Sequence, residues 1–286
     1  MADSASAPTR RATPLPRLLL QVAVVAMAII FAAPSIWLIA ASLKPSDQVL
    51  GDSWSAFTHG GWTIGNYRSV LAQGDFVRWL VNSIFVCSTQ TVLVTLLSSL
   101  GGFALAKYQF TGRRLLMGLM IGTLLLPGQV LLPSVWDVTR SIGWLDTYAA
   151  IIVPGAVNVF GLFLFKQSMA FVPDELLAAG RVDGCSELRL WWDIVMPCIR
   201  PTVSTFALLS FVGSWNAFLW PQIVLMNERK YTVAVGLGNL ASLPQYRTEY
   251  GLMMAGVALS VLPVVVLFLA VHRDFTAGLT SGAVKE

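Results

Sequence analysis

Six long stretches of the sequence contain no Asp, Glu, Lys or Arg, and they alternate with more polar segments. Each stretch is long enough to supply the ~20 apolar residues that carry a helix across the ~30 Å hydrocarbon core of a bilayer. Because a helix satisfies its backbone hydrogen bonds within its own segment, we predict an all-α membrane protein with six transmembrane helices. The predicted spans cover about residues 18–43, 79–106, 115–136, 147–165, 201–227 and 250–271.

These spans define one transmembrane domain, residues 18–272, preceded by a short polar tail. Residues 1–17 are rich in Ala, Ser, Pro and Arg, a composition typical of a disordered tail. The first charge-free stretch holds 26 residues. That length exceeds the roughly 7–15-residue apolar core of a cleaved signal peptide, so we interpret the stretch as a retained span.

The distribution of Lys and Arg predicts the orientation of the spans. An even number of spans places both termini on the same side of the membrane, and basic residues favour the cytoplasmic side. With both termini cytoplasmic, the internal segments hold twelve of the 19 Lys and Arg residues and the external loops hold seven. We therefore predict a cytoplasmic N-terminal tail (1–17), a cytoplasmic loop (166–200) and a cytoplasmic C-terminal tail (273–286). Segments 44–78 and 228–249 then face outward.

Composition supports the membrane assignment and excludes several functions. Hydrophobic residues make up 56% of the chain, charged residues 12%, and the mean hydropathy is +0.69. The net charge of +4 comes without a Lys- or Arg-rich run, which argues against nucleic-acid binding. Three cysteines without CxxC or Cys/His spacing argue against a metal site or a disulfide framework.

The spans also lack the groups that membrane enzymes and proton-coupled carriers need. No ionisable relay lies at membrane depth, since His272 stands at the end of the last span. No nucleophile is paired with a base, so we predict no catalytic residue.

Uncharged polar side chains do occur within the spans. As a set they suit the translocation path of an uncharged, hydroxyl-rich solute; the candidates are Asn82, Gln90, Asn158, Trp215 and Asn216. The alternative for each is a hydrogen bond between helices.

The cytoplasmic loop carries the pattern of two short helices. Pro173 suits the first turn of a helix, and Asp174 and Glu175 favour its positive end. Gly184 can adopt the left-handed conformation that ends a helix.

After this break, Ser186 can cap a second short helix through Trp192, and Pro197 and Pro201 stop it and restart the chain as the fifth span. The residues alone leave two interpretations open. The loop is either a docking element for a partner protein or an amphipathic anchor in the membrane interface.

The segment from Glu175 to Pro197 reads ELLAAGRVDGCSELRLWWDIVMP. It resembles the EAA loop of binding-protein-dependent ABC transporter permeases, with Asp183, Gly184 and Pro197 in register. Other segments resemble the carbohydrate importer branch of that family and its MalG-type inner-membrane subunit; they are Asn82-Ser83 and residues 104–114, 126–129, 215–221 and 278–285. The resemblance covers nearly the whole chain beyond residue 20.

The resemblance implies that the loop couples the chain to an ATPase. The implied coupling residues are Glu175, Ala178, Ala179, Gly180, Asp183, Gly184, Cys185 and Pro197. Ala178 stands where the family pattern has a glutamate, and Gly180 and Cys185 stand where it has alanines. Glu175 lies three residues earlier on the same helical face and can supply a carboxylate there. Gly in a helix interior costs ~1 kcal/mol relative to Ala, so we expect a pliable coupling helix.

The resemblance further implies a type I ABC importer permease fold and a function. The chain would be a membrane-spanning subunit of an ATP-driven, binding-protein-dependent sugar importer in the bacterial inner membrane. It would form half of the translocation path and couple ATPase closure to alternating access. Its implied partners are ATP-binding cassette subunits, a second homologous permease, a periplasmic sugar-binding protein and the lipid bilayer.

The phosphate-binding GxxxxGK[ST] loop is absent, because no Lys in the sequence follows a Gly. We therefore expect a transport subunit without its own ATPase site, which binds no cofactor and leaves ATP and Mg²⁺ to the partner ATPase. Two alternatives remain: a permease for another solute, such as glycerol phosphate or a peptide, and a stand-alone secondary carrier or channel.

Overall fold

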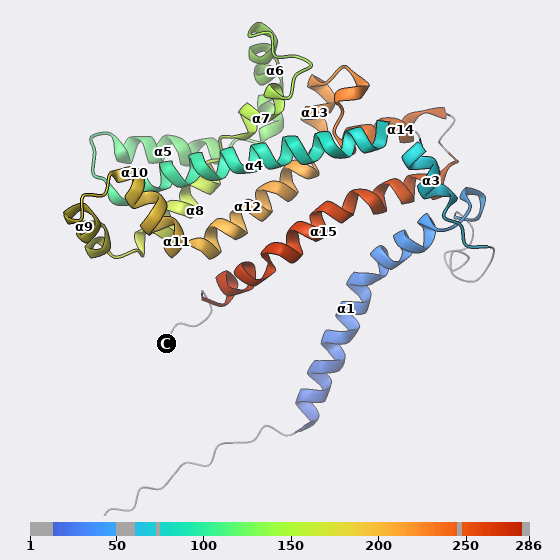
Figure 1. Ribbon diagram of the computed structural model, residues 1–286, viewed down its shortest axis with the longest axis horizontal. Coiled ribbons are helices and arrows are strands. Elements are labelled where there is room, and N and C mark those ends of the chain that lie inside the picture. The colour runs from blue at the N-terminus through green and yellow to red at the C-terminus, as the bar shows by residue number, and fades with distance from the viewer. Residues whose placement is uncertain (1–13, 50–60, 73–74, 245–247, 282–286) are drawn as a thin grey trace, which may run out of the picture. The chain divides into compact units, whose positions relative to one another are not determined.

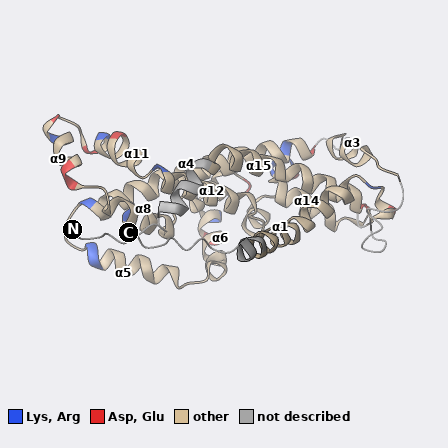
Figure 2. Cartoon of the chain, turned by 90° about the horizontal axis from the view of Figure 1, so that it is seen from below, with Lys and Arg blue, Asp and Glu red and all other residues tan. Residues whose placement is uncertain are grey.

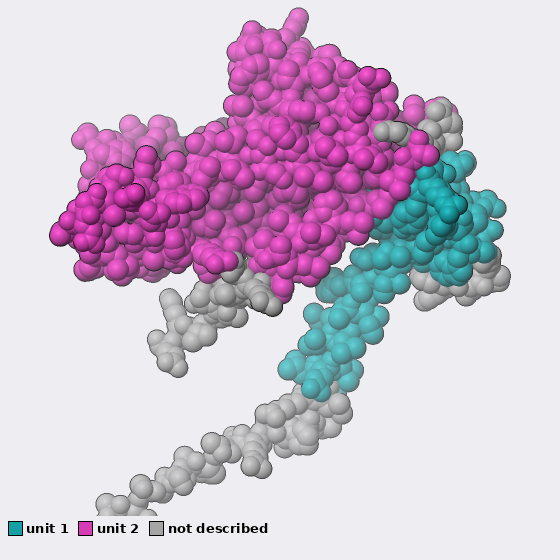
Figure 3. Space-filling view, viewed as in Figure 1, with its two compact units in different colours: residues 1–69, 248–258 teal, residues 70–247, 259–286 magenta. Residues whose placement is uncertain are grey.

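The computed structural model describes residues 14–49, 61–72, 75–244 and 248–281, which are mostly helical and include no strand. The chain divides into two compact units, residues 1–69 with 248–258 and residues 70–247 with 259–286 (Figure 3). Most of the predicted N-terminal tail, the end of the C-terminal tail and parts of both external segments lie outside the described residues.

The smaller unit contains α1 (Pro14–Ser42), η1 (Ser46–Gln48), most of α3 (Gly65–Ala72) and the first turns of α15 (Tyr250–Ser281). Its polar contacts gather where α1 ends. The Asn66 carboxamide donates to Ser42 O at 2.8 Å and to Lys44 O at 2.7 Å. The Ser46 hydroxyl donates to the Glu249 carboxylate at 2.8 Å. These bonds hold α3 and the residue before α15 to the chain that follows α1.

The larger unit is organised around α4 (Asp75–Lys107), a helix of 33 residues. α8 (Val159–Ala170) and α12 (Arg200–Trp215) pack along it (Figure 1), and α7 (Ala149–Gly155) and α14 (Val233–Ser242) also contact it. The remaining elements are α5 (Arg113–Leu124), η2 (Gly128–Leu131), α6 (Leu132–Ser141), α9 (Asp174–Val182), α10 (Glu187–Arg189), the π-helix η3 (Leu190–Val195), α11 (Met196–Cys198), α13 (Leu219–Val224) and η4 (Glu228–Lys230).

Glycines allow the helices around α4 to approach one another closely. A Cβ atom on Gly102 of α4 would lie 2.6 Å from Phe165 Cβ and 2.8 Å from Lys166 N on α8. A Cβ atom on Gly161 of α8 would lie 2.2 Å from Phe206 Cζ on α12. Because lipid tails are as apolar as the side chains, membrane helices associate through such close van der Waals packing.

The predicted number of spans agrees with the helices, but not every span is one straight helix. Among the described residues, α1, α4 and α15 each contain a segment long and apolar enough to cross a membrane. The predicted spans 115–136 and 147–165 correspond to helix pairs bent by 97° and 41°. An extended residue separates each pair, Pro127 in the first and Asn158 in the second. A third bent pair joins Glu187–Cys198 to Arg200–Trp215 at 88°, and with each bent pair counted as one span the described chain has up to six.

The predicted fifth span, residues 201–227, is not a continuous helix. α12 ends at Trp215, and the short helix α13 follows separately. Pro221 contributes to this interruption, because it has no N–H to donate to the carbonyl four residues earlier.

We expect Gly102→Ala to destabilise the protein by about 1–3 kcal/mol, because the added methyl group would overlap the backbone of α8. Gly118→Ala on α5 is the matched control, since no described atom lies within 4 Å of the Cβ position of Gly118. The midpoint of thermal unfolding in detergent, followed by circular dichroism, measures both variants. Equal midpoints would show that α4 and α8 do not depend on this approach.

Candidate functional site

The predicted coupling loop begins with α9, which is tied at its start to the end of α4. Pro173 is the N-cap residue, and Asp174 and Glu175 occupy the first turn. Lys107, the last residue of α4, donates from Nζ to Val172 O at 2.5 Å and to Asp174 Oδ1 at 2.6 Å. The Lys107 side chain is only 6% exposed but Asp174 is 85% exposed, so the ion pair lies at the surface edge of the junction between the two helices.

The end of α9 has the predicted turn. Asp183 ends the helix, and Gly184 has a φ of +81°, which confirms the left-handed conformation expected there. The Gly184 N–H donates to Arg181 O at 3.0 Å, and the Cys185 N–H donates to Gly180 O at 2.9 Å. These bonds satisfy carbonyls that the end of the helix would otherwise leave open.

The second helical segment starts as predicted but runs further. The Ser186 hydroxyl caps α10 by accepting from Arg189 N at 3.4 Å. The chain then continues through the π-helix and α11 to Cys198, instead of ending at Trp192. This helical run ends at Cys198, one residue after Pro197, and Pro201 lies in the first turn of α12, where its missing N–H is tolerated.

One apolar cluster joins the coupling loop to the helices around α4. Leu177 of α9 and Trp191 and Val195 of the π-helix belong to it, and all three are buried. The other buried members come from α4, α8, α12 and the segments beside them: Val94, Phe103, Phe165, Met169, Val172, Ile199 and Phe206. The loop is therefore packed as part of the helical unit.

Gly180 is a packing residue. A Cβ atom there would lie 2.5 Å from Leu190 Cδ2 and 2.9 Å from Ile194 Cδ1. The missing side chain thus lets α9 lie directly on the π-helix. This contact corrects the expectation of a pliable coupling helix, which considered helix propensity alone.

A polar group on the surface of the loop links both of its helical segments to the residue after α4. Glu187 accepts from Arg181 Nε at 2.8 Å and from Arg181 Nη2 at 3.1 Å, and it also accepts from the Tyr108 hydroxyl. Arg181 and then Tyr108 lower the pKa of Glu187, while burial and then Glu187 raise the pKa of Tyr108. Figure 2 shows acidic and basic residues gathered around α9 and α11.

One side of α9 carries a small, largely uncharged surface, which we call the docking face. It consists of Glu175, Ala178, Ala179 and Val182, which share one side of the helix by their spacing, and all four are exposed. Val182 is 88% exposed. Glu175 supplies the only carboxylate on this face and has no hydrogen bond or ion pair with another described residue. Of the other implied coupling residues, Pro197 is exposed and Cys185 half-buried.

Two of the five path candidates meet in one pocket. This central pocket, of about 310 Å³, is lined by Gln90, Asn158, Ser210 and Ser214 among others, and none of its lining residues is charged. Gln90 Oε1 accepts from the Ser214 hydroxyl at 3.0 Å. A Cβ atom on Gly155 would lie 2.1 Å from Gln90 Nε2, so the glycine makes room for the amide. The serines were not predicted, although their spacing of four on α12 places them on one face.

The other three candidates lie elsewhere. Asn82 donates to the carbonyls of Arg229 and Tyr231 at 2.9 and 3.0 Å. Trp215 is buried and stacks on Phe211. Asn216 donates to Val212 O within its own turn. These side chains have structural contacts and do not line the central pocket.

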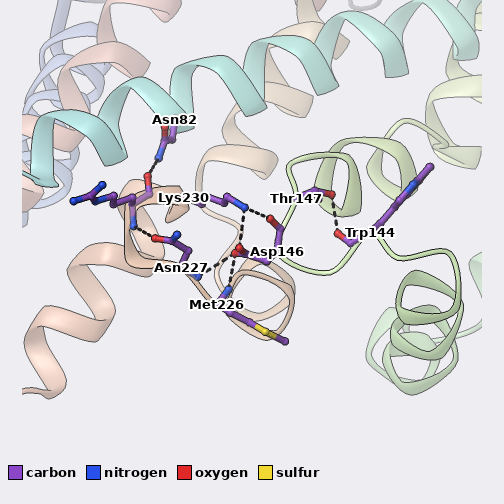
Figure 4. A network of polar contacts seen from close by, with 8 residues as sticks. Asn82, Trp144, Asp146, Thr147, Met226, Asn227 and Lys230 are labelled. Carbon is purple, nitrogen blue, oxygen red and sulfur yellow. Dashed lines mark hydrogen bonds and ion pairs between the residues drawn. The ribbon is translucent and has the colours of Figure 1, made fainter.

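A polar network near the N-terminal half of α4 ties two loops together (Figure 4). Asp146 Oδ1 accepts from the N–H groups of Met226 and Asn227, each at 3.0 Å, and Asp146 Oδ2 accepts from Lys230 Nζ at 2.8 Å. Burial alone would raise the pKa of Asp146. Lys230 and the two N–H donors outweigh burial and lower it. The loop after α6 is thereby fixed to the chain between α13 and η4.

Comparison with known proteins identifies the family. Residues 98–276 match the model of the "binding-protein-dependent transport system inner membrane component" family. The arabinooligosaccharides transport system permease protein AraQ of Halalkalibacterium halodurans is 33% identical over 96% of this chain and 99% of its own length. The chain belongs to this family.

The permease has further relatives with different named solutes. The lactose transport system permease protein LacG of Rhizobium radiobacter is 31% identical over 88% of the permease and 90% of its own length. The sn-glycerol-3-phosphate transport system permease protein UgpE of Shigella flexneri is 31% identical over 71% of the permease and 73% of its own length.

Among solved structures, the permease resembles a chain of a bacterial ABC transporter involved in the import of the acidic polysaccharide alginate. The TM-score is 0.79 at 20% identity, and the match covers 94% of the permease and all of that chain. The likeness confirms the predicted type I importer permease fold. The family makes the permease a multi-pass inner-membrane transport subunit.

We expect Asp146→Asn to destabilise the permease by about 1 kcal/mol at neutral pH, because the amide keeps an acceptor for the two N–H groups but loses the ion pair with Lys230. Folding lowers the pKa of Asp146 below its ordinary value of 3.8. The ionised carboxylate therefore stabilises the folded protein fully at pH values above 3.8. This contribution is lost as the pH falls through the lower folded value. Unfolding midpoints of variant and parent should therefore converge in acid.

Midpoints measured in detergent across this pH range test the expectation. Asp137→Asn, at an exposed carboxylate of α6, is the control and should follow the parent at every pH. A constant difference between Asp146→Asn and the parent would contradict the role of the charge.

Proposed function

We propose that the permease is a membrane-spanning subunit of an ATP-driven bacterial importer of uncharged sugars, with both termini in the cytoplasm. Arabinooligosaccharides, lactose and trehalose appear in the names of its relatives. The central pocket has no charged lining residue, which favours an uncharged sugar over the glycerol phosphate named for another relative. The distribution of Lys and Arg supports the orientation.

The observation that carries the coupling role is the shared apolar cluster. Leu177 and Trp191 of the coupling loop are buried together with Phe103, Phe165 and Phe206 of three long helices. A force applied to α9 by a partner would therefore move these helices as a body. Rigid-body movement of packed elements is a common basis of switching between states open to opposite sides.

The partner that applies this force would be an ATP-binding cassette subunit, which would contact the docking face of α9. ATP and Mg²⁺ would bind to that subunit, since the permease sequence lacks the phosphate-binding loop. A second homologous permease would supply the other half of the translocation path. A periplasmic sugar-binding protein would deliver the solute to the external segments.

Within this half of the path, Gln90 and Asn158 would present their uncharged polar groups to the sugar, together with Ser210 and Ser214. Such groups can exchange hydrogen bonds with hydroxyls without holding a charge at membrane depth. Gly155 and Gly213 also line the pocket, and their missing side chains leave room in it.

We expect Gly184→Pro to abolish ATP-driven uptake while the protein still inserts in the membrane. Proline fixes φ near −65°, whereas Gly184 has a φ of +81° and donates its N–H to Arg181 O. Gly184→Asn is the control, because asparagine tolerates the left-handed region, and it should retain most of the uptake. Radiolabelled sugar uptake by proteoliposomes that contain the complete importer measures both variants.

Normal uptake by Gly184→Pro would contradict the coupling role of the turn. Uptake by the purified chain alone, without ATP or partners, would instead support a stand-alone carrier or channel.

We expect Glu175→Gln to weaken binding of the ATPase subunit about tenfold, which corresponds to ~1.4 kcal/mol, because the docking face loses its only carboxylate. Adding Ala178→Glu should restore the affinity, since residues 175 and 178 lie on the same side of α9. Leu176→Glu in the same background is the positional control and should restore less, because Leu176 is exposed on α9 but lies outside the docking face. Dissociation constants of detergent-solubilised complexes measure all three. Unchanged affinity in Glu175→Gln would show that docking does not use this carboxylate.

A further inference from the structure

A second pocket lies at the N-terminal end of α4 and is not used by the coupling mechanism. It has a volume of about 460 Å³, within the usual range for small-molecule sites. Its walls come from the first turns of α4, from η4 and from α14. In the proposed orientation this end of α4 faces the periplasm, so we call it the outer pocket.

Three α4 side chains close together in sequence hold one wall of the outer pocket. Trp79 Nε1 donates to Glu228 O at 2.8 Å. Asn82 donates to the carbonyls on either side of Lys230, as Figure 4 shows for one of them. The Ser83 hydroxyl accepts from Val233 N at 2.7 Å. Four of the six residues from Glu228 to Val233 are therefore hydrogen-bonded to α4, and Asn82 and Ser83 have a structural role there.

The opposite wall is fixed by close packing. A Cβ atom on Gly236 of α14 would lie 2.2 Å from the ring of Trp79, so the indole lies directly against the helix backbone. Lys230, which belongs to the segment 228–233, is held in turn by Asp146. The pocket is consequently formed in advance of any ligand, and a preformed pocket lowers the ordering cost of binding.

The groups that line the pocket recognise hydrogen-bond donors on an uncharged molecule. Asp75 and Glu228 contribute carboxylates, which accept hydrogen bonds from hydroxyls, and Asn239 contributes a carboxamide. Trp79 and Tyr231 contribute aromatic surface, on which the apolar face of a sugar ring can pack. Two carboxylates without a basic lining residue repel an anionic ligand.

The outer pocket and the central pocket lie on the same side of α4. Trp79 and Gln90 are eleven residues apart, which places them about 16 Å apart along the axis and only about 20° apart around it. Between them, Val86 is buried in an apolar cluster with Ile151 and Val224. Tyr231 lines the outer pocket and also packs against this cluster. These residues thus form an apolar layer between the two polar sites.

We propose that the outer pocket is a subsite that takes an uncharged sugar unit on the periplasmic side of this layer and excludes acidic sugars. The proposal rests on sugar import as the function of the permease. Passage of the unit to the central pocket requires the layer around Val86 to open.

Cysteine labelling tests the subsite directly. Leu240→Cys places a thiol on the pocket wall, in a background with Cys185→Ser and Cys198→Ser; the remaining Cys87 is buried. The complex with its ATPase is assembled in nanodiscs and labelled with a maleimide. We expect at least one of arabinotriose, lactose, trehalose and diacetylchitobiose to slow labelling severalfold. Ala241→Cys, exposed on the next residue of α14 and outside the pocket lining, should be labelled at an unchanged rate.

Acidic oligosaccharides test the charge selection. An alginate oligosaccharide should leave labelling of Leu240→Cys unchanged. It should slow labelling once Asp75→Asn and Glu228→Gln remove both carboxylates. Equal protection by acidic and uncharged sugars without these substitutions would overturn the selectivity.

ATP-dependent uptake of the same sugars by the complete importer separates the two proposals. A sugar that is transported but leaves labelling unchanged overturns the subsite and leaves the proposed function standing. Failure to transport any uncharged sugar overturns the proposed function, whatever the labelling shows.

Discussion

At Gly102 the backbones of α4 and α8 approach so closely that no side chain fits between them. This approach sets the spacing at which Phe165 of α8 and Phe206 of α12 meet in one cluster, where their rings pack edge to face. Leu177 and Trp191 extend the same cluster into the coupling loop. Because close-packed interiors resist gradual deformation, a displacement of the loop has to be shared by the long helices.

The charge-free stretches predicted where apolar helices lie, because a charged side chain is expensive in lipid. Residues 79–106 lie within α4 and residues 250–271 within α15. The same rule gives no information on breaks, since Pro127 and Asn158 carry no charge and membrane helices tolerate proline where neighbours satisfy the freed groups. Asn158 starts α8 because its side chain accepts from Gly161 N at 2.7 Å, a local capping contact that a search for charge-free stretches does not detect.

The coupling loop was more predictable than the path, because its signals are local. Gly184 and Ser186 act on backbone groups within a few residues, so sequence spacing is sufficient to place them. Which polar residues line the translocation path depends instead on the direction in which each one points around its helix. Asn82 and Gln90 are eight residues apart and point about 80° apart around α4, so they face different neighbours. Composition identified both as polar, but only the packing of α7, α12 and η4 decides which one lines a pocket.

Gly180 shows why a single residue can be misread. In a helix interior, glycine costs ~1 kcal/mol relative to alanine, which favours a pliable α9. Its missing Cβ opens the space that Leu190 Cδ2 fills, and Leu190 is fully buried there. Burial of a leucine side chain contributes ~1.5–3 kcal/mol, so the packing outweighs the loss of propensity and holds α9 on the π-helix. The helix propensity of Gly180 can be read from its own position in the sequence. The stabilisation by packing depends on Gly180 and Leu190 together, which are ten positions apart on separate helical segments.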